Sequence, residues 1–178
     1  MNGLDPLDDS GGSGKTKERR MGEKRIAATP EKIQQLRELC DKYGLEGRAV
    51  LERYTNEELS ENIYNGAGPD SWISGAREVL TKLMSLFEPV VLIHDVQFSE
   101  SDALHETFEH TVEMWKQNCK KIFDTEYPFW TWRQLLPSYR VARAKWLAVM
   151  AAANAAISGT AAYKAWREAH FARGDEDE

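Results

Sequence analysis

The feature that most constrains the fold is a long apolar stripe at helical spacing in residues 101–123. The stripe comprises Leu104, Phe108, Val112, Trp115, Cys119 and Ile122. Apolar side chains three or four residues apart share one face of a helix, and that face must be buried against other elements. Similar spacing recurs in residues 33–43 and 73–87, and no internal repeat is visible. The chain therefore predicts an all-α fold.

Composition bounds the size and class of the protein. The 178 residues suffice for one domain, and 23 Lys+Arg against 29 Asp+Glu give a net charge of −6. An acidic chain lacks the electrostatic footprint of a general nucleic-acid binder, so we expect no nucleic-acid partner. Two cysteines, Cys40 and Cys119, exclude a disulfide scaffold and a four-ligand zinc site, and both are predicted to be core thiols.

The composition changes along the chain and divides it into four parts. Residues 1–28 are almost free of apolar side chains and are predicted to be a disordered tail. The string GGSGKT at 11–16 departs from a phosphate loop, because Asp9 stands where that pattern requires glycine. A helical domain is expected at 29–126, an aromatic and basic segment with an Ala-rich helix at 127–172, and an acidic tail at 173–178.

The polar start of the chain carries no apolar stretch typical of a secretory signal. We therefore expect a protein of the cytoplasm or of a virion, and not one secreted by a classical signal.

Local signals predict where individual helices begin. Thr29 followed by Pro30 is typical of a helix N-terminus, and Thr55 with Glu58 forms a capping box that opens a short helix through residue 63. The glycine-rich stretch 64–70 predicts a loop. Residues 89–98 are apolar and β-branched, so propensity favours a buried strand, although a buried helix fits the length equally well.

Two short motifs carry the chemistry. Tyr64, Gly66 and Gly68 form a Y-x-G-x-G string, and His94, Asp95 and Phe98 form an H-D-x-x-aromatic string. In this order the two strings resemble the phospholipase A2 superfamily, in particular its short, cysteine-poor viral and prophage members. The resemblance covers about residues 57–123 and implies that residues 89–98 are a helix packed antiparallel to the helix of residues 101–123.

The resemblance implies a calcium-dependent site for ester hydrolysis. The main-chain carbonyls of Tyr64, Gly66 and Gly68 and the carboxylate of Asp95 would bind Ca²⁺, an ion that prefers hard oxygen ligands. His94 would be the general base that activates water. The family orients this histidine with an Asp on the antiparallel helix. In the family this Asp lies two or three residues before an aromatic, and aligning that aromatic with Trp115 places Val112 or Glu113 there. Glu113 is therefore the candidate and Glu109 the reserve, while Phe98 lacks the hydroxyl of the family's usual tyrosine.

A second group of titratable residues lies on the same expected helix. His105, Glu106, Glu109, His110 and Glu113 are close in sequence, but their spacing is not that of an H-E-x-x-H zinc motif. A solvated polar face and a transition-metal site are both open interpretations, and the polar face is the simpler one.

The C-terminal part mixes aromatic and basic residues. Residues 127–146 combine several aromatic side chains with Arg133, Arg140, Arg143 and Lys145. This mixture suits a phospholipid or membrane surface, or a protein contact. Residues 146–163 are uncharged and Ala-rich, and as one helix they would span about 27 Å. Such a helix can pack on protein neighbours, lie at an interface, or cross a bilayer at the lower limit of length.

Two functional hypotheses follow. The first is a phospholipase-A2-like hydrolase that uses calcium, encoded by a phage or prophage. The second is a catalytically silent version of that fold, whose C-terminal helices bind a membrane, other virion subunits or a second copy of the chain.

Overall fold

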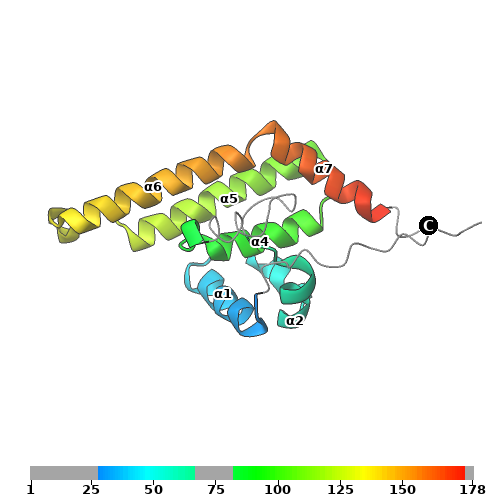
Figure 1. Ribbon diagram of the computed structural model, residues 1–178, viewed down its shortest axis with the longest axis horizontal. Coiled ribbons are helices and arrows are strands. Elements are labelled where there is room, and N and C mark those ends of the chain that lie inside the picture. Colours follow the sequence, from blue (N-terminus) through cyan, green and yellow to red (C-terminus); the bar gives the residue numbers. More distant parts are fainter. Residues whose placement is uncertain (1–27, 67–81, 175–178) are drawn as a thin grey trace, which may run out of the picture.

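The computed structural model describes residues 28–66 and 82–174 of the chain, and within them every regular element is helical, as predicted. The elements in chain order are α1 (Pro30–Lys42), η1 (Arg48–Arg53), α2 (Asn56–Glu58), η2 (Leu59–Ile63), α4 (Glu88–Ser99), α5 (His105–Glu126), η3 (Trp132–Leu135), α6 (Pro137–Ile157) and α7 (Thr160–Gly174). Helix α4 lies in the middle, with α5, α6 and α7 on one side and α1 and α2 on the other (Figure 1).

Some sequence predictions fall outside the described residues. The expected tail at 1–28 and the expected helix at 73–87 lie mostly there, as do Gly68 and most of the acidic tail.

The predicted helix starts are confirmed in atomic detail. The Thr29 hydroxyl accepts a hydrogen bond from the Lys32 amide at 3.3 Å, and Gly44 follows the end of α1 with a φ of 56°. At α2, the Thr55 side chain and the Glu58 side chain each bind the other residue's amide, which completes the capping box. These signals are local, so the sequence alone determines them.

Helix α4 resolves the ambiguity of residues 89–98. Its buried residues are Pro89, Val90, Val91, Leu92, Ile93 and Val96, which lie all around the helix. A helix that is apolar on every side is stable only when other elements surround it. Packing against α1, α5 and α7 thus overrides the β-propensity of the valines, and Pro89 in the first turn fits a helix start.

Helix α5 packs antiparallel to α4 (Figure 1) and also contacts the turn that follows α1. Most of the predicted stripe is buried, but Leu104 is 60% exposed because it precedes the first turn of the helix. The buried Asn118 side chain accepts from the Glu46 amide at 2.8 Å and donates to the Glu46 carbonyl at 2.9 Å. This amide pair fixes the turn between α1 and η1 against α5.

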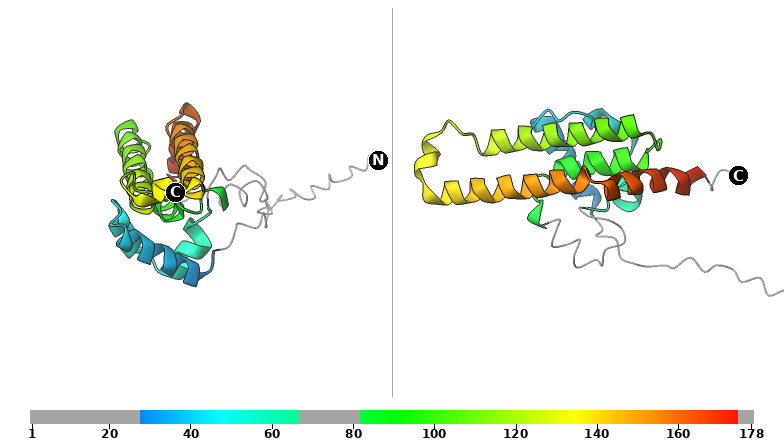
Figure 2. Two further views of the ribbon diagram at one scale, coloured as in Figure 1. Left: turned by 90° about the vertical axis from the view of Figure 1, so that its left-hand side faces the viewer. Right: turned by 90° about the horizontal axis from the view of Figure 1, so that it is seen from above.

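Helices α5 and α6 form a long hairpin, and α7 runs on beyond α6 and bends toward α4 (Figures 1 and 2). The uncharged segment 146–163 is not one helix, because α6 ends at Ile157 and α7 begins at Thr160, with Ser158 and Gly159 between them. None of the helices in the described ranges combines the length and the apolar character that a membrane crossing requires. Within this segment Ala153 is buried, and Trp146, Val149 and Ile157 are partly buried against the core, so the segment packs partly on protein neighbours.

Candidate functional site

His94 lies in the middle of α4 and is held by aromatic rings. Its ring centre is 5.0 Å from that of Phe98, one turn later on α4, and 5.1 Å from that of Trp115 on α5. The Trp115 contact is edge-on, with planes at 74°. The His94 side chain keeps 17% of its surface exposed, so the imidazole is packed in position and still reaches solvent.

Asp95 joins α4 to the glycine-containing loop. Its Oδ2 accepts a hydrogen bond from the Asn65 amide at 3.1 Å, although the two residues are 30 positions apart in sequence. Its Oδ1 lies 3.9 Å from Nδ1 of His94, and the carboxylate is 11% exposed. The carboxylate of the H-D pair therefore lies at the start of the Y-x-G-x-G loop.

Tyr64 anchors the beginning of that loop. The buried Tyr64 hydroxyl donates to Glu88 Oε1 at 3.0 Å, and Lys32 Nζ donates to Glu88 Oε2 at 2.7 Å. Burial, with the nearby Glu88 carboxylate, raises the pKa of Tyr64 far above its usual value, so this hydroxyl stays protonated. The chain thus leaves η2 at a fixed point on α4.

Gly66 provides the turn that follows. It is buried and has a φ of 78°, a conformation that residues with a Cβ rarely adopt. A loop of this kind can direct its carbonyls toward the Asp95 carboxylate, and such a mixture of oxygens suits Ca²⁺. Gly68, the third predicted carbonyl ligand, lies outside the described residues.

Residues 28–66 and 82–174 contain no group of three or more His, Cys, Asp or Glu side chains able to hold a metal ion. The crowded face with His105 and His110 is thus not among such groups in these ranges. The expected calcium set is of a different kind, since three of its four ligands are main-chain carbonyls. Asp95 and Gly66 supply a carboxylate and a main-chain carbonyl, which are the kinds of ligand that this set requires.

The structure does not bring the predicted orienting carboxylates to His94. Glu113 is exposed on α5 and accepts a hydrogen bond from Gln117 Nε2 at 3.0 Å, while Glu109 pairs with His105 at 3.7 Å. Glu113 precedes Trp115 by two residues, which on a helix turns it about 200° away. Because Trp115 faces α4, Glu113 faces solvent. The carboxylate selected by the motif alignment therefore points away from His94.

Trp115 is the site residue that sequence reasoning missed. It belongs to the apolar stripe and was expected only as core, yet it contacts His94 and its indole Nε1 donates to Asn154 Oδ1 on α6 at 3.1 Å. The position on the stripe was a usable signal, because it is the aromatic of α5 with which the family motif aligns. His94 thus contacts the rings of Trp115 and Phe98, whereas the resemblance implied a contact with a carboxylate of α5.

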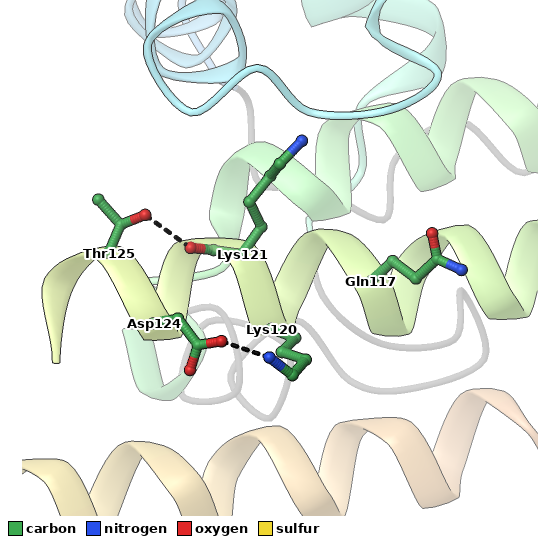
Figure 3. A pocket seen from close by; sticks show the side chains of 5 residues that line it. All are labelled: Gln117, Lys120, Lys121, Asp124 and Thr125. Atoms are coloured by element: carbon green, nitrogen blue, oxygen red, sulfur yellow. Dashed lines mark hydrogen bonds and ion pairs between the residues drawn. The ribbon is translucent and has the colours of Figure 1, made fainter. Parts of the chain in front are cut away.

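An open hollow on α5 lies apart from these residues (Figure 3). It is lined by Gln117, Lys120, Lys121, Asp124 and Thr125. Lys120 pairs with Asp124, the Thr125 hydroxyl donates to the Lys121 carbonyl at 2.8 Å, and Lys121 Nζ donates to the Gly44 carbonyl at 2.7 Å. These groups satisfy one another on an exposed helix face and form no catalytic grouping.

The described residues thus define an all-α protein with an H-D pair on a buried helix beside a glycine loop. No family model matches the chain, and no curated protein or solved structure matches it either.

Proposed function

We propose that the protein is a calcium-dependent, phospholipase-A2-like hydrolase of phospholipid esters, with His94 as general base and Asp95 as the carboxylate ligand. The observation that carries the proposal is the 3.1 Å hydrogen bond from the Asn65 amide to Asp95 Oδ2. This bond joins two motifs that lie 30 residues apart, in the arrangement that the resemblance implies.

Asp95 and the carbonyls of Tyr64, Gly66 and Gly68 would hold the ion. Calcium bound there would polarise the ester carbonyl and balance the negative charge that develops on its oxygen. His94 takes a proton from water as the water oxygen bonds to the carbonyl carbon. His94 then returns the proton to the departing alcohol oxygen, which releases a fatty acid and a lysophospholipid.

Two structural features support this role for His94. Its ring is fixed between Phe98 and Trp115, which limits the orientations that it can adopt. It also remains 17% exposed, so water has access to it.

The test is hydrolysis of short-chain phospholipid, kept monomeric in solution, with calcium and with a chelator. Wild type is expected to release fatty acid only with calcium. His94→Gln is expected to lower the rate about 100-fold or more, and Asp95→Asn is expected to abolish the calcium dependence. His110→Gln, an exposed histidine on α5, is the matched control and should keep full activity. Equal rates in wild type and His94→Gln would contradict the mechanism.

The catalytically silent fold is the second candidate, and one observation favours it. The side chain of α5 that touches His94 is the indole of Trp115, which carries no negative charge to stabilise a protonated imidazole. Under this hypothesis His94 is a structural side chain of the core. Calcium-dependent thermal stabilisation of wild type without any hydrolysis would favour the silent fold, and hydrolysis would exclude it.

A further inference from the structure

The α5–α6 hairpin projects beyond the rest of the molecule. Its end, here called the hairpin tip (residues 128–136), lies at the far side from the C-terminus and extends past α1 and α4 (Figures 1 and 2). The tip contains η3 and connects Glu126, the last residue of α5, to Pro137, the first of α6. A projecting end of this shape meets a surface before any other part of the hairpin does.

The hairpin tip exposes its large apolar side chains. Trp130 is 91% exposed, Leu135 84%, Trp132 70%, Phe129 58% and Leu136 43%. A contiguous exposed group of this kind on a water-soluble fold marks an interaction site. Tryptophan in particular favours the boundary between water and lipid, where its ring is apolar and its N–H remains solvated.

The exposure does not result from a loosely held loop. The Tyr139 hydroxyl donates to the Pro128 carbonyl at 2.8 Å, and Arg143 Nε donates to the Tyr127 carbonyl at 3.3 Å. The Arg143 guanidinium also lies 5.4 Å from the centre of the Phe129 ring. These contacts tie the tip to α6, so that its indoles are presented on a fixed support.

The charge around the tip is opposite to that of the whole chain. Residues 127–146, the tip and the first half of α6, contain no Asp or Glu, and their cations are Arg133, Arg140, Arg143 and Lys145. The chain as a whole carries −6. The acids that precede the tip, Asp124 and Glu126, are already paired with Lys120 and Lys42. A positive region with exposed indoles complements a surface of anionic phospholipid headgroups.

We propose that the hairpin tip docks on bilayers that contain anionic phospholipid. Its indoles enter the headgroup region, and Arg133 and Arg140, both exposed, meet the phosphates. A second copy of the chain suits the tip less well, because the same positive charge on both copies would repel. Docking requires no hydrolysis, so it extends the proposed function without depending on it.

The test is co-sedimentation of the full chain with vesicles in the presence of a chelator, which removes calcium-dependent effects. The two vesicle types are phosphatidylcholine alone and an equal mixture of phosphatidylcholine and phosphatidylglycerol. Wild type is expected to bind the mixed vesicles at least about tenfold more tightly, because cations near an anionic surface each contribute severalfold. Equal binding to both vesicles, or none to the mixed ones, would overturn the proposal.

Variants locate the contact. The double variant Trp130→Ala/Trp132→Ala is expected to weaken binding to mixed vesicles about tenfold or more, and Arg133→Gln about fivefold. The matched controls are Phe171→Ala, which is 57% exposed on α7, and Lys120→Gln on α5; both should bind as wild type does. Unchanged binding by the double variant would overturn the proposal, as would a dimer in solution that these substitutions dissociate. Hydrolysis of monomeric lipid by the same variants stays a separate readout, so that either proposal can fail alone.

Discussion

Helix α4 and the hairpin tip contain similar side chains in opposite surroundings. Leu92 and Ile93 on α4 are fully or almost fully buried, whereas Leu135 and Trp130 at the tip are 84% and 91% exposed. Apolar character alone therefore does not say where a side chain lies in this molecule. The difference indicates that the apolar residues of α4 stabilise the fold, while those of the tip are available for binding.

The most direct test of this difference is the same Leu→Ala substitution in α4 and at the hairpin tip. Leu92→Ala leaves a cavity in a core that cannot fully collapse, and we expect the free energy of unfolding to fall by about 2–5 kcal/mol. Leu135→Ala removes an exposed side chain and should change it by less than about 0.5 kcal/mol. Chemical denaturation monitored by circular dichroism measures both. Similar losses at the two positions would show that the tip is buried in solution.

A smaller effect is expected where the loop meets α4. Asp95→Asn keeps an acceptor for the Asn65 amide but removes its charge, and we expect unfolding in chelator to cost about 1 kcal/mol less than in wild type. Glu113→Gln, on the exposed face of α5, is the control and should leave stability unchanged. An Asn variant as stable as wild type would mean that the loop is not fastened at Asp95.

The smallest effect concerns the contact between the end of α1 and the end of α5, next to the hairpin tip. The Tyr43 hydroxyl donates to Glu126 at 2.5 Å and Lys42 lies 3.3 Å away; the Tyr43 hydrogen bond is the larger cause that lowers the pKa of Glu126. A lowered pKa in the folded state contributes stability above the unfolded value of 4.5, and that contribution is lost as the pH falls through the folded value. Glu126 is partly exposed, so the contribution is below about 1 kcal/mol.

Urea denaturation of wild type and Glu126→Gln from neutral pH down to about pH 3 measures this contribution. The free energy of unfolding of wild type should exceed that of the variant at neutral pH, and this difference should shrink as the pH falls. A difference in unfolding free energy that stays constant with pH would contradict stabilisation by the hydrogen bond between Tyr43 and the ionised Glu126.

The sequence predicts what depends on near neighbours in the chain. The caps at Thr29 and Thr55 and the buried stripe of α5 are local patterns, and they are confirmed except at Leu104, which is exposed. The strand propensity of residues 89–98 failed as a guide, because burial on all sides of α4 outweighs the preference of valine. The break at Gly159 was missed because the surrounding alanines favour helix on both sides.

The candidate site was predictable only in part. The resemblance placed His94 and Asp95 on one helix, which is α4, and the Asn65 amide binds the Asp95 carboxylate. The contact between His94 and Trp115 depends on how α4 and α5 are rotated against each other. That rotation is set by the whole core, so counting residues back from an aromatic selected Glu113, which lies on the wrong face.

Helix α5 also fixes the distance between His94 and the hairpin tip. It contacts His94 through Trp115 and ends at Glu126 beside the tip, so the candidate site and the hairpin tip lie along one continuous helix. At 1.5 Å per residue, the distance along that helix from Trp115 to Glu126 is about 17 Å. If the hairpin stands upright on a bilayer, His94 is held at least that far above the headgroups. If the hairpin reclines, the imidazole descends toward them, so the tilt of α5 decides whether a lipid still embedded in the membrane comes within reach.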